Sequence, residues 1–148
     1  MGAHPYSYLV PYQHDLQRAL DELREREFEQ GRYNPVMMYP PEFVDERTPR
    51  GPGRQHDTIN EALEAAEEDG TRSILDIELV GDEAEFGVAR RLTEEELEEY
   101  FGTTTPNRAQ VLDNTPTEDV ERGQAVCVPV YDEDGLPVAI YFFGYSCD

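Results

Sequence analysis

The chain has 148 residues with 12 arginines, no lysine and 33 acidic residues, so its formal net charge is −21. Direct binding to a nucleic-acid backbone is disfavoured, because such binding depends on neutralising phosphates with Lys and Arg. The length fits one domain over 1–148 with a core of its own, and no apolar run approaches the length of a membrane span, so we expect a cytoplasmic protein.

The first part of the chain predicts a strand and then an amphipathic helix. Residues 6–10 (YSYLV) are rich in residues that favour strands. Residues 14–30 carry apolar side chains at helical spacing, and Gly31 is a natural stop just past the end of that helix. We also expect a short edge strand at 36–39, because a proline stands on each side of it.

A long loop follows at about 40–56, with four prolines, two glycines and three arginines. Long loops in compact domains are often functional. One hypothesis is that Arg47, Arg50 and Arg54 bind an anion or offset the acidic segment that follows. The other is that the loop is a solvated connector.

Helices and strands alternate in the middle of the chain. Capping boxes at 58–61 and 93–96 predict two helices, which end near Gly70 and Phe101. Between them we expect strands over 72–81 and 83–92, joined by a turn at Gly81. A further strand at 108–112 and one helical turn at 117–121 complete this region.

The end of the chain predicts a β-hairpin over 124–145, in which two apolar runs flank the turn sequence DEDG. We expect Ile140 and Phe142 to point into the main core, with Val126, Val128 and Val130 on the same side of the sheet. The opposite face carries Tyr141, Phe143 and Tyr145. Those aromatic residues either pack under helices or form an apolar surface for a homodimer.

These elements predict an α+β fold, with a mainly antiparallel sheet of about five strands and two to three helices packed on it. The cysteines Cys127 and Cys147 are not expected to form a disulfide, because Cys127 would lie opposite Ile140. The three histidines and two cysteines lack zinc-binding spacing, and no catalytic sequence motif is present. We therefore assign no catalytic residue, metal site or cofactor.

The negative charge is concentrated in residues 57–100, which hold 16 acidic residues and three arginines, a net charge of −13. This segment predicts an acidic surface that steers a cationic partner toward it. The candidate partner-binding residues are Glu61, Glu64, Glu67, Glu68, Glu94, Glu95, Glu98 and Glu99.

The leading functional hypothesis is a small binding protein that neutralises or regulates a basic protein, as an immunity protein or an antitoxin does. A DNA mimic that occupies a nucleic-acid-binding site is a special case. The alternative is a small enzyme or anion-binding domain that uses the arginine loop and the aromatic hairpin. A third interpretation is that the acidity reflects a high-salt cytoplasm or a GC-rich genome and not a partner.

Overall fold

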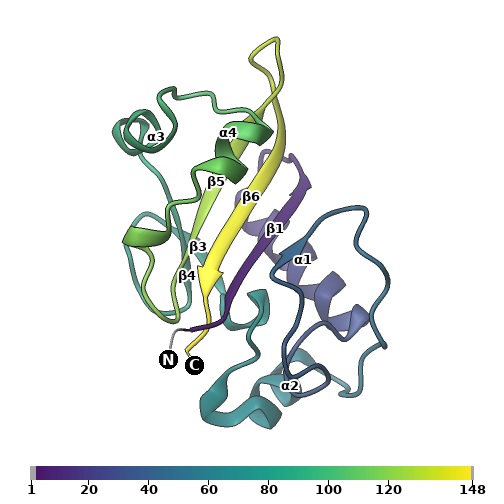
Figure 1. Ribbon diagram of the computed structural model, residues 1–148. Coiled ribbons are helices and arrows are strands. Elements are labelled where there is room, and N and C mark those ends of the chain that lie inside the picture. The colour runs from purple at the N-terminus through teal and green to yellow at the C-terminus, as the bar shows by residue number, and fades with distance from the viewer. Residues whose placement is uncertain (1–2, 148) are drawn as a thin grey trace.

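The computed structural model describes residues 3–147, which form one six-stranded sheet with helices on both faces (Figure 1). The strands are β1 (Pro5–Pro11), β2 (Phe43–Val44), β3 (Leu79–Gly81), β4 (Val88–Arg91), β5 (Ala125–Tyr131) and β6 (Pro137–Tyr145). The α-helices are α1 (Leu16–Gln30), α2 (Ile59–Ala66), α3 (Glu94–Phe101) and α4 (Arg108–Asp113). Short 3-10 turns are η1 (Glu67–Asp69), η2 (Ile74–Asp76) and η3 (Thr117–Asp119).

The sheet is mixed, in the order β2-β1-β6-β5-β4-β3. Strand β6 is antiparallel to both β1 and β5, whereas β1–β2, β4–β5 and β3–β4 are parallel pairs. The α+β class is confirmed, and the expectation of a mainly antiparallel sheet is wrong. The hairpin expected around Gly81 does not form. Because β3 has only three residues and rises about 10 Å, the short connection 82–87 can return the chain so that β4 starts beside the beginning of β3.

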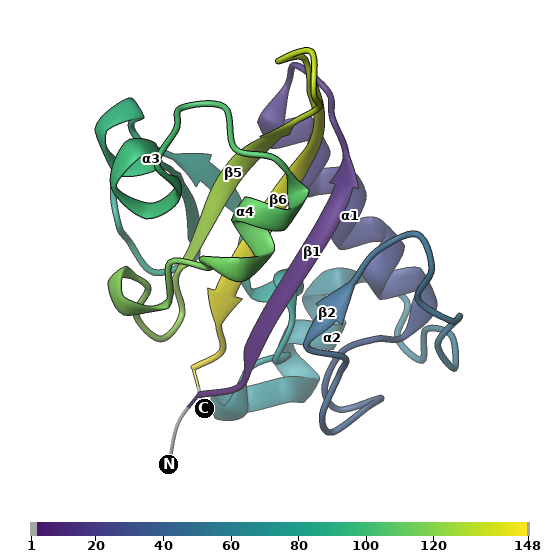
Figure 2. The same cartoon turned by 45° about the horizontal axis from the view of Figure 1, so that its top comes forward.

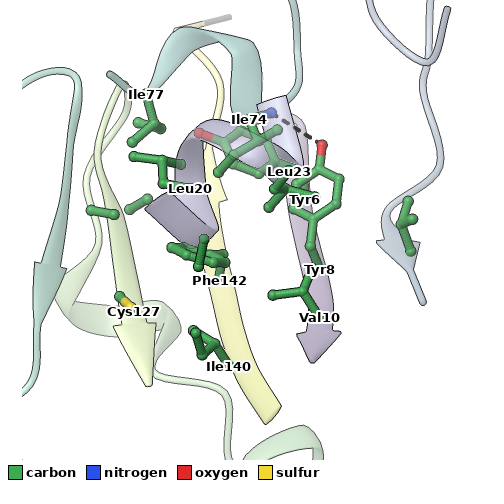
Figure 3. Close-up of a cluster of buried hydrophobic side chains, with 14 residues drawn as sticks. Tyr6, Tyr8, Val10, Leu20, Leu23, Ile74, Ile77, Cys127, Ile140 and Phe142 are labelled. Atoms are coloured by element: carbon green, nitrogen blue, oxygen red, sulfur yellow. Dashed lines mark hydrogen bonds between the residues drawn. The ribbon is translucent and has the colours of Figure 1, made fainter. Parts of the chain in front are cut away.

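Both faces of the central hairpin are buried, and each has its own core. One core lies between the sheet and α1 and contains Ile140, Phe142 and Cys127 (Figure 3). The other lies under α3 and α4, and its members from the hairpin are Val126, Val128, Val130, Tyr141 and Phe143. Figure 2 shows α3 and α4 on the side of the sheet opposite α1.

The expected placement of the three valines beside Phe142 is therefore wrong. Residues directly opposite each other in an antiparallel pair share a face, and here Cys127 pairs with Phe142, not with Ile140. Val126 pairs with Phe143 and so points to the other core. Since both faces are apolar, hydrophobic alternation alone could not assign them. Cys127 and Cys147 are both free thiols.

The proline-rich loop at 40–56 is pinned to the C-terminal end of α1. The backbone N–H of Gly53 donates to the Gln30 carbonyl at 2.9 Å, and Arg32 Nη1 donates to the Pro49 carbonyl at 2.8 Å. Gly31 must lack a side chain here, because a Cβ would come within 2.1 Å of the Gly53 carbonyl oxygen. The loop also contains β2, whereas the edge strand expected at 36–39 is a series of turns.

Local capping signals account for most helix boundaries. Thr93 and Glu96 form the complete capping box expected at the start of α3. At α2, Thr58 accepts from the Glu61 N–H, but the Glu61 carboxylate accepts from the Asp57 N–H, so only half of the box forms. The strand expected at 108–112 is wrong. Asn107 and Gln110 form a second complete capping box, and this segment is α4. No helix within residues 3–147 has both the length and the apolar character needed to cross a membrane.

Candidate functional site: an acidic cavity beside helix α2

The structure divides the eight candidate glutamates into two separate groups. Glu61, Glu64, Glu67 and Glu68 lie exposed on α2 and η1, which pack in the same layer as α1. Glu94, Glu95, Glu98 and Glu99 lie exposed on α3, which covers the opposite face of the sheet. Figure 1 shows α2 at the bottom of the molecule and α3 at its upper left. The residues that we expected to form one acidic face thus form two.

The α2 group borders a cavity of about 380 Å³ that gathers acidic residues from two segments. Glu67 and Glu68 come from η1, and Asp76 and Glu78 come from η2 and the residues just after it. Among the residues that the structure describes, no arginine lines this cavity. Its remaining lining residues are Leu63, Gly70, Phe86 and Cys147.

Asp76 is the most deeply placed of these carboxylates, and it is held by Thr71. Asp76 Oδ1 accepts from the Thr71 backbone N–H at 3.0 Å and from its hydroxyl at 2.9 Å. Burial raises the pKa of Asp76, and the Thr71 hydrogen bonds together with the charge of Arg24 oppose that increase. A cation that entered the cavity would therefore stabilise a carboxylate that is poorly solvated.

The charge of Arg24 acts on Asp76, but its guanidinium is hydrogen-bonded elsewhere. Its Nη2 donates to the Leu75 carbonyl at 2.8 Å. Burial lowers the pKa of Arg24, and the charges of Glu78 and Asp76 partly counteract that effect. Arg24 lines a neighbouring cavity at the N-terminal end of α2, which shares Glu78 with the acidic cavity.

Phe86 forms an aromatic wall of the acidic cavity. Although the side chain is 72% exposed, its ring lies directly on the backbone of Gly123. A Cβ at Gly123 would come within 2.3 Å of a Phe86 ring carbon, and Gly123 also has a positive φ of 78°. Glycine is thus required on both counts, and it allows the exposed ring to sit in a defined place.

Tyr6 lies behind this site. Its hydroxyl is completely buried and has no hydrogen-bond partner among residues 3–147. Burial raises the pKa of Tyr6 well above its ordinary value, and the nearby charges of Asp76 and Cys147, two cavity-lining residues, raise it further. Figure 3 places Tyr6 in the same part of the core as Ile74 and Ile77, which lie close to Asp76 along the chain.

The structure does not assemble the three arginines of the loop into an anion site. Arg54 interacts with Glu29 at 3.7 Å and lies over the ring of Phe28, with 5.7 Å between its Cζ and the ring centroid. Arg47 and Arg50 are exposed, and neither lines a cavity that the described residues form around Arg54.

A second cavity, of about 530 Å³, lies at the N-terminal end of α1, and three of its polar residues already have structural contacts. Asp15 caps the helix, and Gln17 bonds the edge of β3. Arg91 forms two hydrogen bonds of 2.9 Å with Asp82. Within residues 3–147, no group of three or more His, Cys, Asp or Glu side chains is placed to hold a metal ion.

The aromatic face proposed for a homodimer is not a surface. Tyr141 and Phe143 are only 2% and 5% exposed, because α4 and the neighbouring elements cover them. The Tyr141 hydroxyl also lies 3.1 Å from Thr115 Oγ1. This candidate interface is therefore corrected: Tyr141 and Phe143 are core residues, and Tyr145 is partly buried against them.

Sequence reasoning found Glu67 and Glu68 but missed Asp76, Glu78 and Phe86. These three fell inside segments expected to be strands, where their approach to α2 could not be foreseen. The available signal was the pair Asp76 and Glu78, two acidic residues that would have lain on one face of an otherwise apolar strand. Comparison with protein-family models, with curated proteins and with solved structures finds no match to this chain.

Proposed function

We propose that this protein is a small acidic binding protein that neutralises or regulates a basic partner protein, in the manner of an immunity protein or an antitoxin. The observation that carries the proposal is the unbalanced charge around α2. Within residues 3–147, none of the four glutamates of α2 and η1 forms an ion pair with an arginine.

The arginines of the same acidic segment are engaged away from this surface. Arg90 pairs with Glu96 at 2.7 Å, and Arg91 pairs with Asp82. Arg72 donates to the Met38 carbonyl and lies over the ring of Tyr39. The charge of α2 and η1 therefore projects into solvent, where it can accelerate the approach of a basic protein.

The proposal is tested by association kinetics with a basic protein captured from the native host. We expect the association rate to fall steeply between about 20 mM and about 200 mM salt, because the Debye length shrinks over this range. Replacing Glu61, Glu64, Glu67 and Glu68 with Gln should slow association more than replacing Glu98 and Glu99. An association rate that is insensitive to salt and to both sets of substitutions would contradict the proposal.

Adding duplex DNA to the same binding experiment tests whether the protein acts as a DNA mimic. If the basic partner is a nucleic-acid-binding protein and the acidic surface occupies its DNA site, duplex DNA will compete with this protein for it. Among residues 3–147, the anion-binding alternative gains no support from the geometry, because Arg54 already interacts with Glu29 and neither Arg47 nor Arg50 lines the cavity beside Arg54.

A further inference from the structure

We propose that the acidic cavity between η1, η2 and Phe86 receives one arginine side chain of the basic partner, as the anchor of that complex. This inference rests on the proposed function and adds to it a defined site and a defined ligand. The cavity presents four carboxylates, an exposed aromatic ring and the apolar side chain of Leu63, and its described lining contains no basic residue.

The walls of the cavity match the chemistry of an arginine side chain. An arginine side chain has an apolar stem and a planar guanidinium with five hydrogen-bond donors. Leu63 and Phe86 can contact the stem and stack on the guanidinium plane, and Glu67, Glu68 or Asp76 can accept its hydrogen bonds. A lysine would satisfy the charge, but a compact ammonium offers neither the planar stacking nor the paired donors.

The Phe86 ring packs on the backbone of Gly123 while most of it stays exposed. Packing an exposed phenylalanine ring in one position adds little to the stability of a fold. The Phe86 ring nevertheless packs on the backbone of Gly123, which has no side chain. The backbone N–H of Gly87 further ties this segment to the Gly123 carbonyl at 2.8 Å. A ring held in this way can form a cation–π contact without first losing conformational entropy.

Two buried polar groups, the Tyr6 hydroxyl behind the cavity and the Asp76 carboxyl that lines it, are poorly compensated. The buried Tyr6 hydroxyl lacks a hydrogen-bond partner among the described residues, and burial penalises the ionised form of its neighbour Asp76. A guanidinium in the cavity would favour the ionised form of Asp76, whose side chain the Thr71 hydrogen bonds already hold in place.

The test uses NMR titration of the full chain with a short peptide, blocked at both ends, that carries a single central arginine. A matched peptide carries citrulline, which keeps the shape of arginine but has no charge. We expect the arginine peptide to shift the backbone signals of Gly70, Glu78 and Phe86 and to leave those of α3 unchanged. The citrulline peptide should produce no such shifts.

Two pairs of variants then separate a cavity from general electrostatics. E67Q/E68Q and E98Q/E99Q each remove two exposed negative charges, and only the first pair lies at the cavity. We expect E67Q/E68Q to weaken peptide binding by about tenfold and E98Q/E99Q by less than about twofold. F86L, which removes the aromatic ring, should weaken binding by about threefold or more, and by more for arginine than for lysine.

The outcomes distinguish this inference from the function on which it rests. Equal weakening by the two double variants, or shifts spread equally over α2 and α3, would overturn the cavity and leave an unspecific acidic surface. No shift with the arginine peptide, together with salt-dependent association of a basic protein, would overturn the anchor and support the proposed function. Binding at the cavity without any salt-dependent association of a basic protein would support the arginine site and contradict the proposed function.

Discussion

The side-chain amide of Gln17 pairs with the outer edge of β3 at Val80. The Val80 N–H donates to Gln17 Oε1 at 2.8 Å, and Gln17 Nε2 donates to the Glu78 carbonyl at 3.0 Å. One amide of α1 thus occupies the two backbone positions that a neighbouring strand would use. Exposed edge strands invite pairing with other chains, and this contact covers the edge of β3.

We expect Q17A to destabilise the protein by about 1–3 kcal/mol, because it leaves the partly buried Val80 N–H without its acceptor. Hydrogen exchange at Val80 should accelerate more than exchange at β5. Q13A is the matched control, since Gln13 only donates to the exposed side chain of Glu22. An effect of Q13A equal to that of Q17A would contradict the protective role of this contact.

The ion pair of Glu27 and Arg32 makes the second prediction. Glu27 is completely buried and accepts two hydrogen bonds of 2.8 Å from Arg32, and Arg26 Nε donates to it at 3.0 Å. Replacing one member of a buried pair leaves the other poorly compensated, so E27Q should destabilise the protein by about 3–5 kcal/mol in urea unfolding. R18Q, which breaks the exposed pair with Glu22, should cost less than about 1 kcal/mol.

The sequence predicted those elements whose formation depends on interactions between residues close together along the chain. Residue patterns within short segments correctly predicted four features. These are the C-terminal hairpin, strand β1, the helix that ends at Gly31 and the capping box at Thr93. The parallel pairing of β3 with β4 was not predicted, because it depends on a connection that turns the chain through tertiary contacts. One such contact is the seat of Phe86 on Gly123, residues far apart in the sequence.

The cavity was missed for a related reason. Its carboxylates come from η1 and from η2, and their meeting depends on a buried turn around Thr71 and Asp76. The sequence around Ile74 is as apolar as a strand, and tertiary packing against α1 decides that it forms a 3-10 turn. Charge counting located the acidic segment, but it could not divide that segment between two faces of the sheet.

Phe142 makes the third prediction. The side chain is fully buried between β1, β5 and α1, so F142A should destabilise the protein by about 3–5 kcal/mol. L136A is the matched control, because Leu136 lies exposed in the hairpin turn and should change stability by less than about 0.5 kcal/mol. Chemical unfolding monitored by circular dichroism measures both. A cost for F142A as small as that for L136A would mean that this core is not packed as the structure shows.

The two thiols make the fourth prediction. Burial raises the pKa of Cys127 to about 12, and burial together with the charge of Asp76 raises the pKa of Cys147. Because the thiolate is the reactive form, both should react slowly with iodoacetamide, and the more exposed Cys147 should react first. Mass spectrometry should show one modification of the folded protein and a second only in denaturant. C147S should remove the first modification, and rapid labelling of folded C147S would contradict the burial of Cys127.

Asp76 and Glu96 make the fifth prediction, because their stability effects should change with pH in opposite directions. Burial raises the native pKa of Asp76, so the folded state holds its proton more tightly than the unfolded chain does. The contribution of Asp76 therefore becomes less favourable as pH rises from about 4 through that raised value. Consequently D76N, which keeps an oxygen for the Thr71 hydrogen bonds, should gain stability relative to the native chain between acidic and neutral pH.

The contribution of Glu96 to stability should change with pH in the direction opposite to that of Asp76. The hydrogen bond from Arg90 lowers the pKa of Glu96, so its contribution is present above about pH 4 and is lost as pH falls through the lowered native value. E96Q should therefore be most destabilising near neutral pH, and its effect should shrink in acid. The measurement is urea unfolding of the native chain and of both variants between about pH 3 and about pH 7. For each variant it gives the slope with pH of the stability difference from the native chain. Slopes of the same sign for D76N and E96Q would show that the burial of Asp76 does not dominate its titration.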